Sequence, residues 1–439
     1  MMSSRDAATA ADPTTWGARN AHDPTVVRGD DGRWYMFSTD AAAGVDEVPA
    51  GVHVRTSPDL VEWTFVGTAL DGVPAAAFAH SGAAGLWAPE VVRWPSADGS
   101  PRWHMYYSAS TFGSRTSVIG LATASSPAGP WTDAGPVVTT THQVDGHNAI
   151  DAAVVFDRAG RPWLTYGSFF GGIHILPLDV RTGFAERPGE VGTLIARRPA
   201  SVDGAVEGAY IVYRPEEDRF VLFVSYDSLF DSYSMRVAVS SSVTGPYLDA
   251  NGRTLTDVSG GTPDAVGTKI LGGHRFPDGT AWIAPGHNSV FRDGDRLFLV
   301  HHVRHADDPT RHEAQIRRVH VTASGWPLVS PHPFAGYDSE RLRAPEAVSG
   351  DWDVVRFDPA ERGVAASVRL PVVAAAHTDG QALTTPLIVS ASGGPDDADI
   401  VLDAVVFGAF DPVAQRPVLA FAGLDAAGVV WTGSKAVTA

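Results

Sequence analysis

The chain has 439 residues, of which 19% are charged and 44% are hydrophobic, with a formal net charge of −17 and a pI near 5.3. This length allows more than one domain, and the acidic balance argues against nucleic acid, whose phosphates bind basic surfaces. The absence of cysteine excludes disulfides, zinc–thiolate sites and thiol catalysis. Because no run of about 18 apolar residues occurs, we expect no transmembrane helix and no membrane partner.

The first 20 residues are expected to form a flexible lead. Residues 1–15 are rich in alanine and serine but lack the apolar segment of a secretory signal. The sequence as given therefore predicts a cytoplasmic protein, and an extracellular one if a signal segment is missing from it.

From residue 21 to residue 337 the chain repeats a unit of strand, polar turn and strand. The turns carry the Gly, Asp and Pro that tight reversals need. Aligning the apolar runs puts five residues at equivalent positions, namely Asp23, Ala88, Asp151, Gly208 and His287. Five all-β repeats predict a five-bladed β-propeller, in which the starts of the innermost strands meet at one end of the central channel.

A second repeat supports the propeller independently of the first. Residues 57–63, 125–131 and 242–247 are similar to one another, and each follows one apolar strand and leads into another. We expect these segments to be equivalent outer turns of three blades.

The character of the sequence changes beyond residue 337. Residues 338–350 are charged and loop-like, and short apolar runs then alternate with turn residues, as at 404–408 and 417–421. We expect residues 338–439 to form a small β-barrel or sandwich. The predicted fold class is therefore all-β, with a five-bladed propeller over residues 21–337 followed by this C-terminal domain.

Three carboxylates lie at the channel ends of expected inner strands: Asp23, Asp151 and Glu207. Carboxylates that converge in a cleft repel one another, so at least one would have its pKa raised and could carry a proton at neutral pH. An acid and a base with divergent pKa values are what glycosidic bond cleavage requires. The alternative is that Asp23 and Asp151 only cap turns, which is common for a single Asp-Pro but weaker for three equivalent positions.

Aromatic residues beside loops are candidates for stacking on sugar rings: Trp87, Phe169 and Phe170. His287 could act as a base, as the partner of a carboxylate, or as a ligand to an ion in the channel. A second group, His301, His302, His305 and His312, is a weak metal candidate, because successive residues of a strand point to opposite faces.

With these motifs the chain resembles glycoside hydrolase family 43, and most closely its arabinanases, which are five-bladed propellers that cut α-1,5-linked arabinan. Seven segments carry the resemblance: residues 22–24, 87–90, 148–151, 167–173, 206–210, 244–249 and 286–290. The C-terminal part is similar to the β-barrel domain of a two-domain subset of these arabinanases, through residues 415–425 and 428–431.

The resemblance implies a division of labour among the carboxylates. Asp23 is expected to be the general base that activates water, Glu207 the general acid, and Asp151 the residue that keeps Glu207 protonated and oriented. The family inverts configuration, so Asp23 and Glu207 should lie roughly 6.5–9.5 Å apart, leaving room for water. His287 is expected to lie next to a channel calcium ion that is coordinated mainly through water.

The resemblance also implies a substrate and its contacts. The substrate is expected to be a neutral plant-type polysaccharide or oligosaccharide, bound by a monomer. The residues expected to contact it are His22, Trp87, Asn148, Ser168 and Phe169.

Three positions depart from the family pattern: Glu90 replaces the commoner Asp, Ala152 a Pro, and Gly208 an Ala. None of them removes a catalytic carboxylate. Two alternatives stay open from the sequence. One is an exo-acting α-L-arabinofuranosidase or β-xylosidase of the same family, and the other is a non-catalytic carbohydrate-binding propeller.

Overall fold

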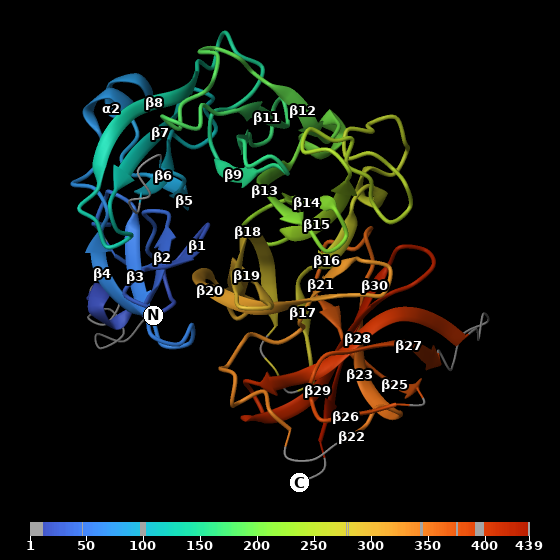
Figure 1. Ribbon diagram of the computed structural model, residues 1–439. Coiled ribbons are helices and arrows are strands. Elements are labelled where there is room, and N and C mark those ends of the chain that lie inside the picture. The colour runs from blue at the N-terminus through green and yellow to red at the C-terminus, as the bar shows by residue number, and fades with distance from the viewer. Residues whose placement is uncertain are drawn as a thin grey trace.

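A computed structural model describes residues 12–45, 47–96, 102–277, 279, 281–342, 346–374, 376–390 and 399–437. Most of this chain forms five antiparallel sheets arranged as blades around a channel (Figure 1). The prediction of an all-β propeller followed by a barrel is confirmed. None of the described helices is long and apolar enough to cross a bilayer.

The first three blades each contain four strands in sequence order. Blade 1 is β1 (Thr25–Arg28), β2 (Trp34–Ser38), β3 (His53–Ser57) and β4 (Thr64–Thr68). Blade 2 is β5 (Trp87–Trp94), β6 (Arg102–Ala109), β7 (Ser117–Ala124) and β8 (Thr132–Thr140). Blade 3 is β9 (Ala153–Phe156), β10 (Pro162–Tyr166), β11 (Ile173–Pro177) and β12 (Thr193–Ala196).

The last two blades lie beside the C-terminal domain (Figure 1). Blade 4 is β13 (Val206–Arg214), β14 (Arg219–Tyr226), β15 (Ser234–Ser240) and β16 (Thr268–Leu271). Blade 5 is β18 (Trp282–Asp293), β19 (Arg296–His305), β20 (Asp308–Val321) and β21 (Pro327–Val329), with β17 (His274–Arg275) paired to the start of β18. The innermost strands β1, β5, β9, β13 and β18 pack against their neighbours around the ring, which β18 closes against β1.

The helical segments of the described chain are short, and all but the first lie between strands. They are η1 (Pro13–Thr15), α2 (Ala75–Ser81), η2 (Ala200–Val202) and η3 (Pro263–Ala265). The similar segments 57–63, 125–131 and 242–247 follow β3, β7 and β15, the third strands of their blades, as the expectation of equivalent outer turns requires.

The expected flexible lead needs a correction from residue 12 onward, whereas residues 1–11 lie outside the described residues. Trp16 is only 2% exposed, and its ring centroid lies 5.2 Å from that of Phe65. Asn20 N donates to His312 O at 3.0 Å, and Ala314 N donates to Ala18 O at 2.9 Å. The segment is therefore fixed because it buries an indole and adds backbone hydrogen bonds to β20 of the last blade.

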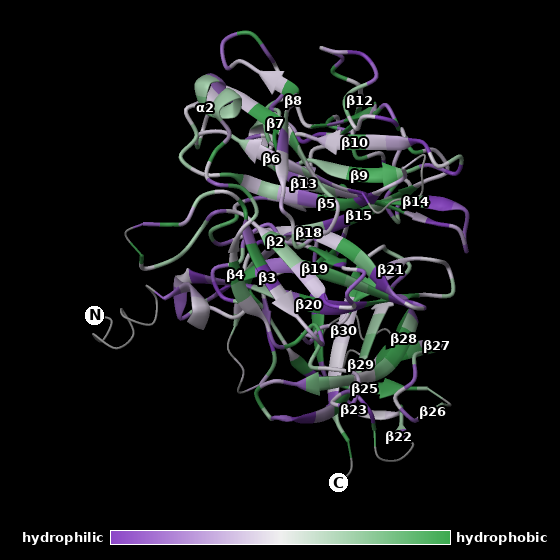
Figure 2. Cartoon of the chain, turned by 60° about the vertical axis from the view of Figure 1, so that its left-hand side comes forward, coloured by the Kyte–Doolittle hydropathy of each residue, from purple (hydrophilic) through white to green (hydrophobic). Residues whose placement is uncertain are grey.

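The C-terminal domain is a closed barrel. Its strands are β23 (Gly350–Phe357), β25 (Val368–Val373), β27 (Leu383–Ser390), β28 (Asp399–Asp411), β29 (Arg416–Leu424) and β30 (Val430–Ala436). The short strands β22 (Glu346–Ala347) and β26 (His377–Thr378) pair with each other. Figure 2 shows β28 and β29 of the barrel largely in hydrophobic colours.

The barrel and the propeller share a hydrophobic core. Phe407 and Val418 of the barrel belong to the same buried cluster as Leu271 of blade 4 and Leu299 of blade 5. In addition β24 (Ala365–Ala366) pairs in parallel with β17, so the C-terminal part of the chain extends the sheet of the last blade. Apolar burial and strand pairing thus hold the two domains together.

Candidate active site

The five positions aligned from the sequence share one backbone conformation. Their φ angles lie in the left-handed region, at 50° for Asp23, 41° for Ala88, 60° for Asp151, 59° for Gly208 and 49° for His287. Left-handed backbone is unusual for residues other than glycine. Its recurrence once per blade shows that the alignment found the true structural repeat.

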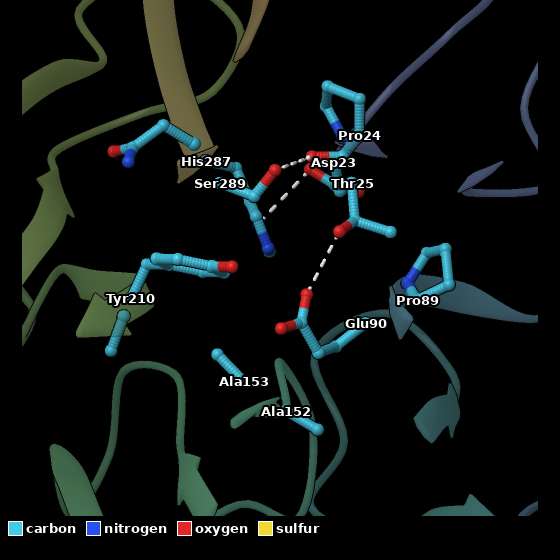
Figure 3. Close-up of a pocket in the computed structure, with 12 residues that line it drawn as sticks. Asp23, Pro24, Thr25, Pro89, Glu90, Ala152, Ala153, Tyr210, His287 and Ser289 are labelled. Atoms are coloured by element: carbon cyan, nitrogen blue, oxygen red, sulfur yellow. Dashed lines mark hydrogen bonds and ion pairs between the residues drawn. The ribbon is translucent and has the colours of Figure 1, made fainter. Parts of the chain in front are cut away.

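The same five positions border a small pocket at the channel axis. Every blade contributes one segment to its lining, which comprises residues 23–25, 89–90, 152–153, 209–210 and 287–289 (Figure 3). The sequence prediction that the starts of the inner strands converge is therefore confirmed. Groups that are far apart in the sequence share one buried space.

Hydrogen bonds between consecutive blades fix the amides of these left-handed residues. The acceptor is a side chain on the second strand of one blade, or just after that strand. The donor is the backbone amide of the left-handed residue in the next blade. The pairs are Ala88 N to Thr39 Oγ1 at 2.9 Å, Asp151 N to Ser108 Oγ at 3.0 Å, His287 N to Ser225 Oγ at 2.8 Å, and Asp23 N to His302 Nδ1 at 3.3 Å. In blade 3 the corresponding residue is Gly167, and the amide of Gly208 instead donates to Asp151 Oδ2 at 3.2 Å.

Asp23 is held as a carboxylate by donors on both oxygens. His22 Nδ1 lies 2.9 Å and His287 Nδ1 3.1 Å from Oδ1, while Thr39 Oγ1 donates to Oδ2 at 2.6 Å. Burial favours the neutral acid, but the imidazoles of His22 and His287 outweigh it, and the pKa of Asp23 lies well below its usual value. An ionised carboxylate in this position can accept a proton from water.

Glu207 is held in the opposite way, as a buried acid between two hydroxyl groups. Ser168 Oγ lies 2.6 Å from Oε2, and Tyr233 OH lies 2.9 Å from Oε1. Burial raises the pKa of Glu207 above its usual value, although both hydroxyls favour the ionised form. Asp23 and Glu207 therefore have pKa values that diverge in the sense required of a base and an acid.

Asp151 contacts both the backbone beside Glu207 and the imidazole that contacts Asp23. Its Oδ2 accepts from Gly208 N, next to Glu207 in the chain, and lies 4.0 Å from His287 Nδ1. Burial, with the charges of Glu207 and Asp23, raises the pKa of Asp151 to about 7 against the effect of His287. Burial disfavours the His287 imidazolium, yet Asp23 and Asp151 outweigh it and raise the pKa of His287 to about 9.

The residues expected to contact substrate have different surroundings. Phe169 and Trp87 are half-buried at strand ends, where a sugar could reach them. Ser168 contacts Glu207 directly. Asn148 is 3% exposed and accepts from Ser117 Oγ at 2.7 Å. His22 is 7% exposed and directs Nδ1 at Asp23, a geometry that suits holding the carboxylate better than touching a sugar.

Three residues beside the carboxylates were not predicted from the sequence: Thr39, Tyr233 and His302. His302 Nδ1 lies 3.3 Å from Asp23 Oδ1, and its ring stacks on that of His22 at a centroid distance of 3.6 Å. From the sequence His302 was only one member of a weak metal candidate, and in the fold it pairs with Gly286, the residue before His287. Thr39 follows the second strand of its blade, and Tyr233 lies in a loop, so neither stood out by pattern.

Besides Asp23, the pocket is lined by other groups that carry oxygen atoms. Glu90 Oε2 accepts from Thr25 Oγ1 at 2.9 Å, and burial raises the pKa of Glu90 to about 8. Asn288 is 2% exposed, and its Oδ1 and Nδ2 are buried without a hydrogen-bond partner among the described residues. Carboxylate, amide and hydroxyl oxygens are the donors that a hard cation such as calcium prefers. The donor set therefore fits the expected calcium ion.

A second group of possible metal ligands includes Asp23 itself. His22, Asp23 and His302 offer ligand atoms within 4.8 Å of one another. A metal held there would occupy the carboxylate that the neighbouring imidazoles keep ionised.

The fold and the geometry of the site define a carbohydrate-cleaving propeller, and comparison with known proteins gives its family. The model of glycosyl hydrolases family 43 matches residues 17–327, and the chain belongs to that family. It is thus a glycoside hydrolase, as the motifs predicted.

Two curated relatives differ in how much of the chain they match. Extracellular endo-α-(1→5)-L-arabinanase 2 of Bacillus subtilis (strain 168) is 27% identical over 95% of this chain and 93% of its own length. An extracellular exo-α-(1→5)-L-arabinofuranosidase of Cellvibrio japonicus is 30% identical over 74% of this chain and 90% of its own length.

A solved structure extends the similarity to both domains. The endo-1,5-α-L-arabinanase of Thermotoga petrophila RKU-1 superimposes with a TM-score of 0.80 at 25% identity, covering 97% of this chain and 100% of that one. The similarity to endo-acting enzymes therefore includes the barrel.

Proposed function

We propose that this protein is an inverting, endo-acting hydrolase of α-1,5-linked L-arabinan and its oligosaccharides. The single observation that carries the proposal is that two buried carboxyls, both acted on by the charge of His287, have pKa values shifted in opposite directions, downward for Asp23 and upward for Glu207. The two full-length relatives, both named endo-arabinanases, support the substrate and the endo mode.

In the proposed reaction Asp23 removes a proton from a water molecule, whose oxygen attacks the anomeric carbon. The glycosidic C–O bond breaks as Glu207 gives its proton to the leaving oxygen, and the new hydroxyl lies on the opposite face of the sugar. The charge of Asp151 keeps the proton on Glu207 until the bond breaks, because two neighbouring carboxyls do not readily ionise together. Thr39 and His22 hold Asp23 toward the water.

Debranched linear arabinan tests this function directly. We expect a mixture of arabino-oligosaccharides of several lengths at early times, and proton NMR should detect the first-formed reducing ends in the β-configuration. Absence of any sugar release would contradict hydrolysis, and α-configured products would contradict inversion. Arabinose as the sole early product would favour the exo-acting alternative that the Cellvibrio japonicus relative represents.

We further propose that the channel pocket binds a calcium ion. Glu90 and the unpartnered Asn288 would contribute oxygen ligands, and His287 would face the ion through water. When bound, the ion would supply positive charge close to Asp23 and so favour its ionised form.

The site of action and the oligomeric state are proposals as well. The relatives named above are called extracellular, which supports action outside the cell, where plant polysaccharide is found. The sequence as given predicted a cytoplasmic protein, with export as its alternative. That the protein acts as a monomer stays a prediction, which light scattering can check.

A further inference from the structure

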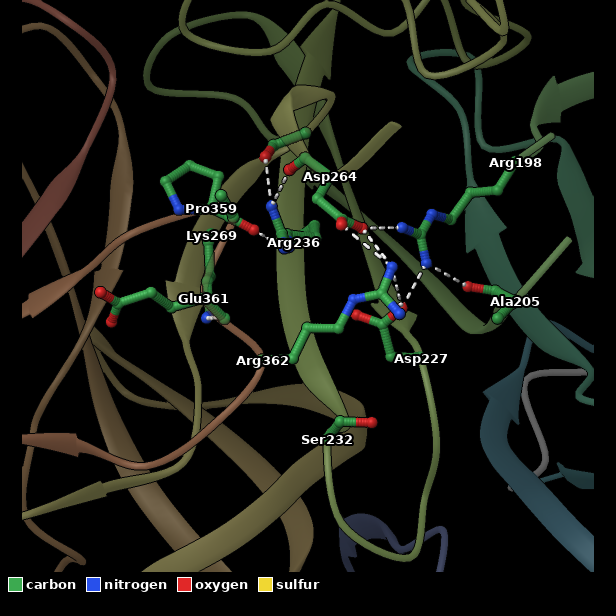
Figure 4. Close-up of polar contacts among 12 residues, drawn as sticks. Arg198, Ala205, Asp227, Ser232, Arg236, Asp264, Lys269, Pro359, Glu361 and Arg362 are labelled. Carbon is green, nitrogen blue, oxygen red and sulfur yellow. Dashed lines mark hydrogen bonds and ion pairs between the residues drawn. The ribbon is translucent and has the colours of Figure 1, made fainter. Parts of the chain in front are cut away.

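A segment of the C-terminal part of the chain is anchored in blade 4. Arg236 Nη2 donates to Pro359 O at 2.9 Å, and Lys269 Nζ donates to Glu361 O at 2.6 Å (Figure 4). Both cations are buried, so these carbonyl oxygens satisfy donors that would otherwise be left unpaired. Residues 358–362 therefore have a fixed position against the propeller.

This anchored segment directs Arg362 at two acidic residues of blade 4. Arg362 Nη2 lies 2.9 Å from Asp264 Oδ2, 3.1 Å from Asp264 Oδ1 and 3.7 Å from Asp227 Oδ1. Its side chain is 44% exposed, whereas that of Asp227 is 5% exposed. Arg362, which lies outside the propeller, thus places a positive charge beside the buried carboxylate of Asp227.

Arg198 joins the same two acids from the other side. Its Nη1 donates to Asp227 Oδ1 at 2.7 Å, its Nη2 donates to Asp264 Oδ1, and its side chain is 2% exposed. Figure 4 shows Arg198, Asp227, Asp264 and Arg362 converging on one point. In such a buried group the removal of one charge leaves the others without full compensation, which is costly.

The cluster is connected to Glu207 by two routes. Along the first, Arg198 Nη1 and Asp227 N both donate to Ala205 O, at 3.2 and 3.3 Å, two residues before Glu207. Along the second, Asp227 begins the loop that returns at Tyr233, whose amide donates to Ser228 O at 2.7 Å and whose hydroxyl donates to Glu207 at 2.9 Å. Both the backbone and one hydroxyl partner of Glu207 therefore depend on where Asp227 lies.

We propose that Arg362 is a positioning residue for Glu207, through which the C-terminal domain holds the proton donor in place. The proposal rests on the proposed function, because it takes Glu207 as the acid. It gives the C-terminal domain a part in the reaction that requires no contact with the sugar.

The test compares Arg362→Ala with Arg369→Ala in the intact protein. Arg369 is a matched control, since it is an exposed arginine of the same domain, 3.1 Å from Asp353. On linear arabinan we expect Arg362→Ala to lower kcat about tenfold with KM changed less than about twofold, because small displacements of a catalytic group cost rate. Arg369→Ala should match the wild type, and an equal loss in both variants would overturn the proposal.

Two further measurements separate positioning from general loosening. The 2,4-dinitrophenyl glycoside of α-1,5-arabinobiose has a leaving group that needs no proton, so Arg362→Ala should cleave it at nearly the wild-type rate. Equal losses on this substrate and on arabinan would overturn the proposal. A single nitrogen of Arg362 makes both contacts with Asp264, so Arg362→Lys should keep most of the wild-type kcat. If Arg362→Lys is as slow as Arg362→Ala, that result would also count against the proposal.

Failure of the proposed function can be told apart from failure of this contact. If the wild-type protein releases no sugar from arabinan, the assignment of Glu207 fails, but the contact can still be measured. A double-mutant cycle of Arg362→Ala and Asp264→Asn in thermal unfolding should give a nonzero coupling energy. Zero coupling would overturn the contact between Arg362 and Asp264 on which the proposal depends.

Discussion

The imidazole Nδ1 of His287 lies 3.1 Å from Oδ1 of Asp23, and this contact joins the fifth blade to the first at the channel axis. The same nitrogen lies 4.0 Å from Asp151, so one cation serves two carboxylates. Asp23, which His22 also contacts, keeps a low pKa, whereas Asp151, which faces Glu207, has its pKa raised. The two residues are both aspartates, so the difference between their pKa values comes from their neighbours.

Removing either proposed catalytic group should abolish most turnover. We expect Glu207→Gln and Asp23→Asn each to lower kcat on linear arabinan by at least about a hundredfold, the low end for loss of a general acid or base. Asp30→Asn is the matched control, since Asp30 is an exposed aspartate of the first blade. A near-normal rate in either site variant would refute the role assigned to that residue.

The pH dependence of kcat/KM should report the Glu207–Asp151 pair on its alkaline side. Activity needs a protonated Glu207, so it should fall as pH rises through the pKa values of the pair, one of which lies near 7. The Tyr233 hydroxyl favours the ionised form of Glu207, so Tyr233→Phe should raise the pKa of Glu207 and move the alkaline limb to higher pH. Tyr213→Phe is the control, since Tyr213 lies at the opposite end of β13 from Glu207 and its hydroxyl contacts Asp218. An unmoved limb in Tyr233→Phe would contradict the assignment.

Removal of calcium should lower stability if the channel pocket binds the ion. A ligand that binds only the folded state adds about 2.7 kcal/mol at a concentration 100-fold above its Kd, so a chelator should lower the melting temperature and added calcium should restore it. Glu90→Gln should weaken this calcium response, whereas Glu340→Gln, at a buried carboxyl outside the pocket, should keep it. Identical melting curves with and without chelator would remove the ion from the proposal.

Gly286 should be intolerant of even one methyl group. A Cβ atom at this position would overlap Cδ1 of Tyr233, whose hydroxyl contacts Glu207. We expect Gly286→Ala to lower kcat roughly tenfold by displacing the ring, and to add little to Tyr233→Phe because both changes act on one contact. Gly260→Ala, where the added methyl meets nothing within 4 Å among the described residues, is the control. Fully additive losses of kcat in the double variant would show that Gly286→Ala acts through a contact other than that of Tyr233 with Glu207.

The sequence was sufficient to predict the ring of five blades and the carboxylates that lie near its axis. Apolar runs recur once per blade, so aligning them located Asp23, Asp151 and His287 without any knowledge of contacts. The left-handed φ angles at these positions agree with that alignment. The family motifs then supplied the roles of the carboxylates, which the geometry alone would have left to chemical argument.

Side-chain contacts between the strands of one blade could not be read in the same way. Thr39 and Tyr233 each bind a carboxylate of their own blade, but single hydroxyl residues are too common to stand out in a sequence. The N-terminal segment was expected to be flexible because its composition is polar and small. The burial of Trp16 and Asn20, together with backbone pairing to β20, fixes it from residue 12 onward.

The chain of amide hydrogen bonds from each blade to the next has a consequence for assembly. Asp23 in the first blade is bound through its amide to His302 in the last, so the base reaches its final orientation only once the circle is complete. A partly folded chain would hold its acidic side chains in unrelated orientations. Hydrolysis can therefore begin only when the final blade has docked, and recovery of activity during refolding would time that event.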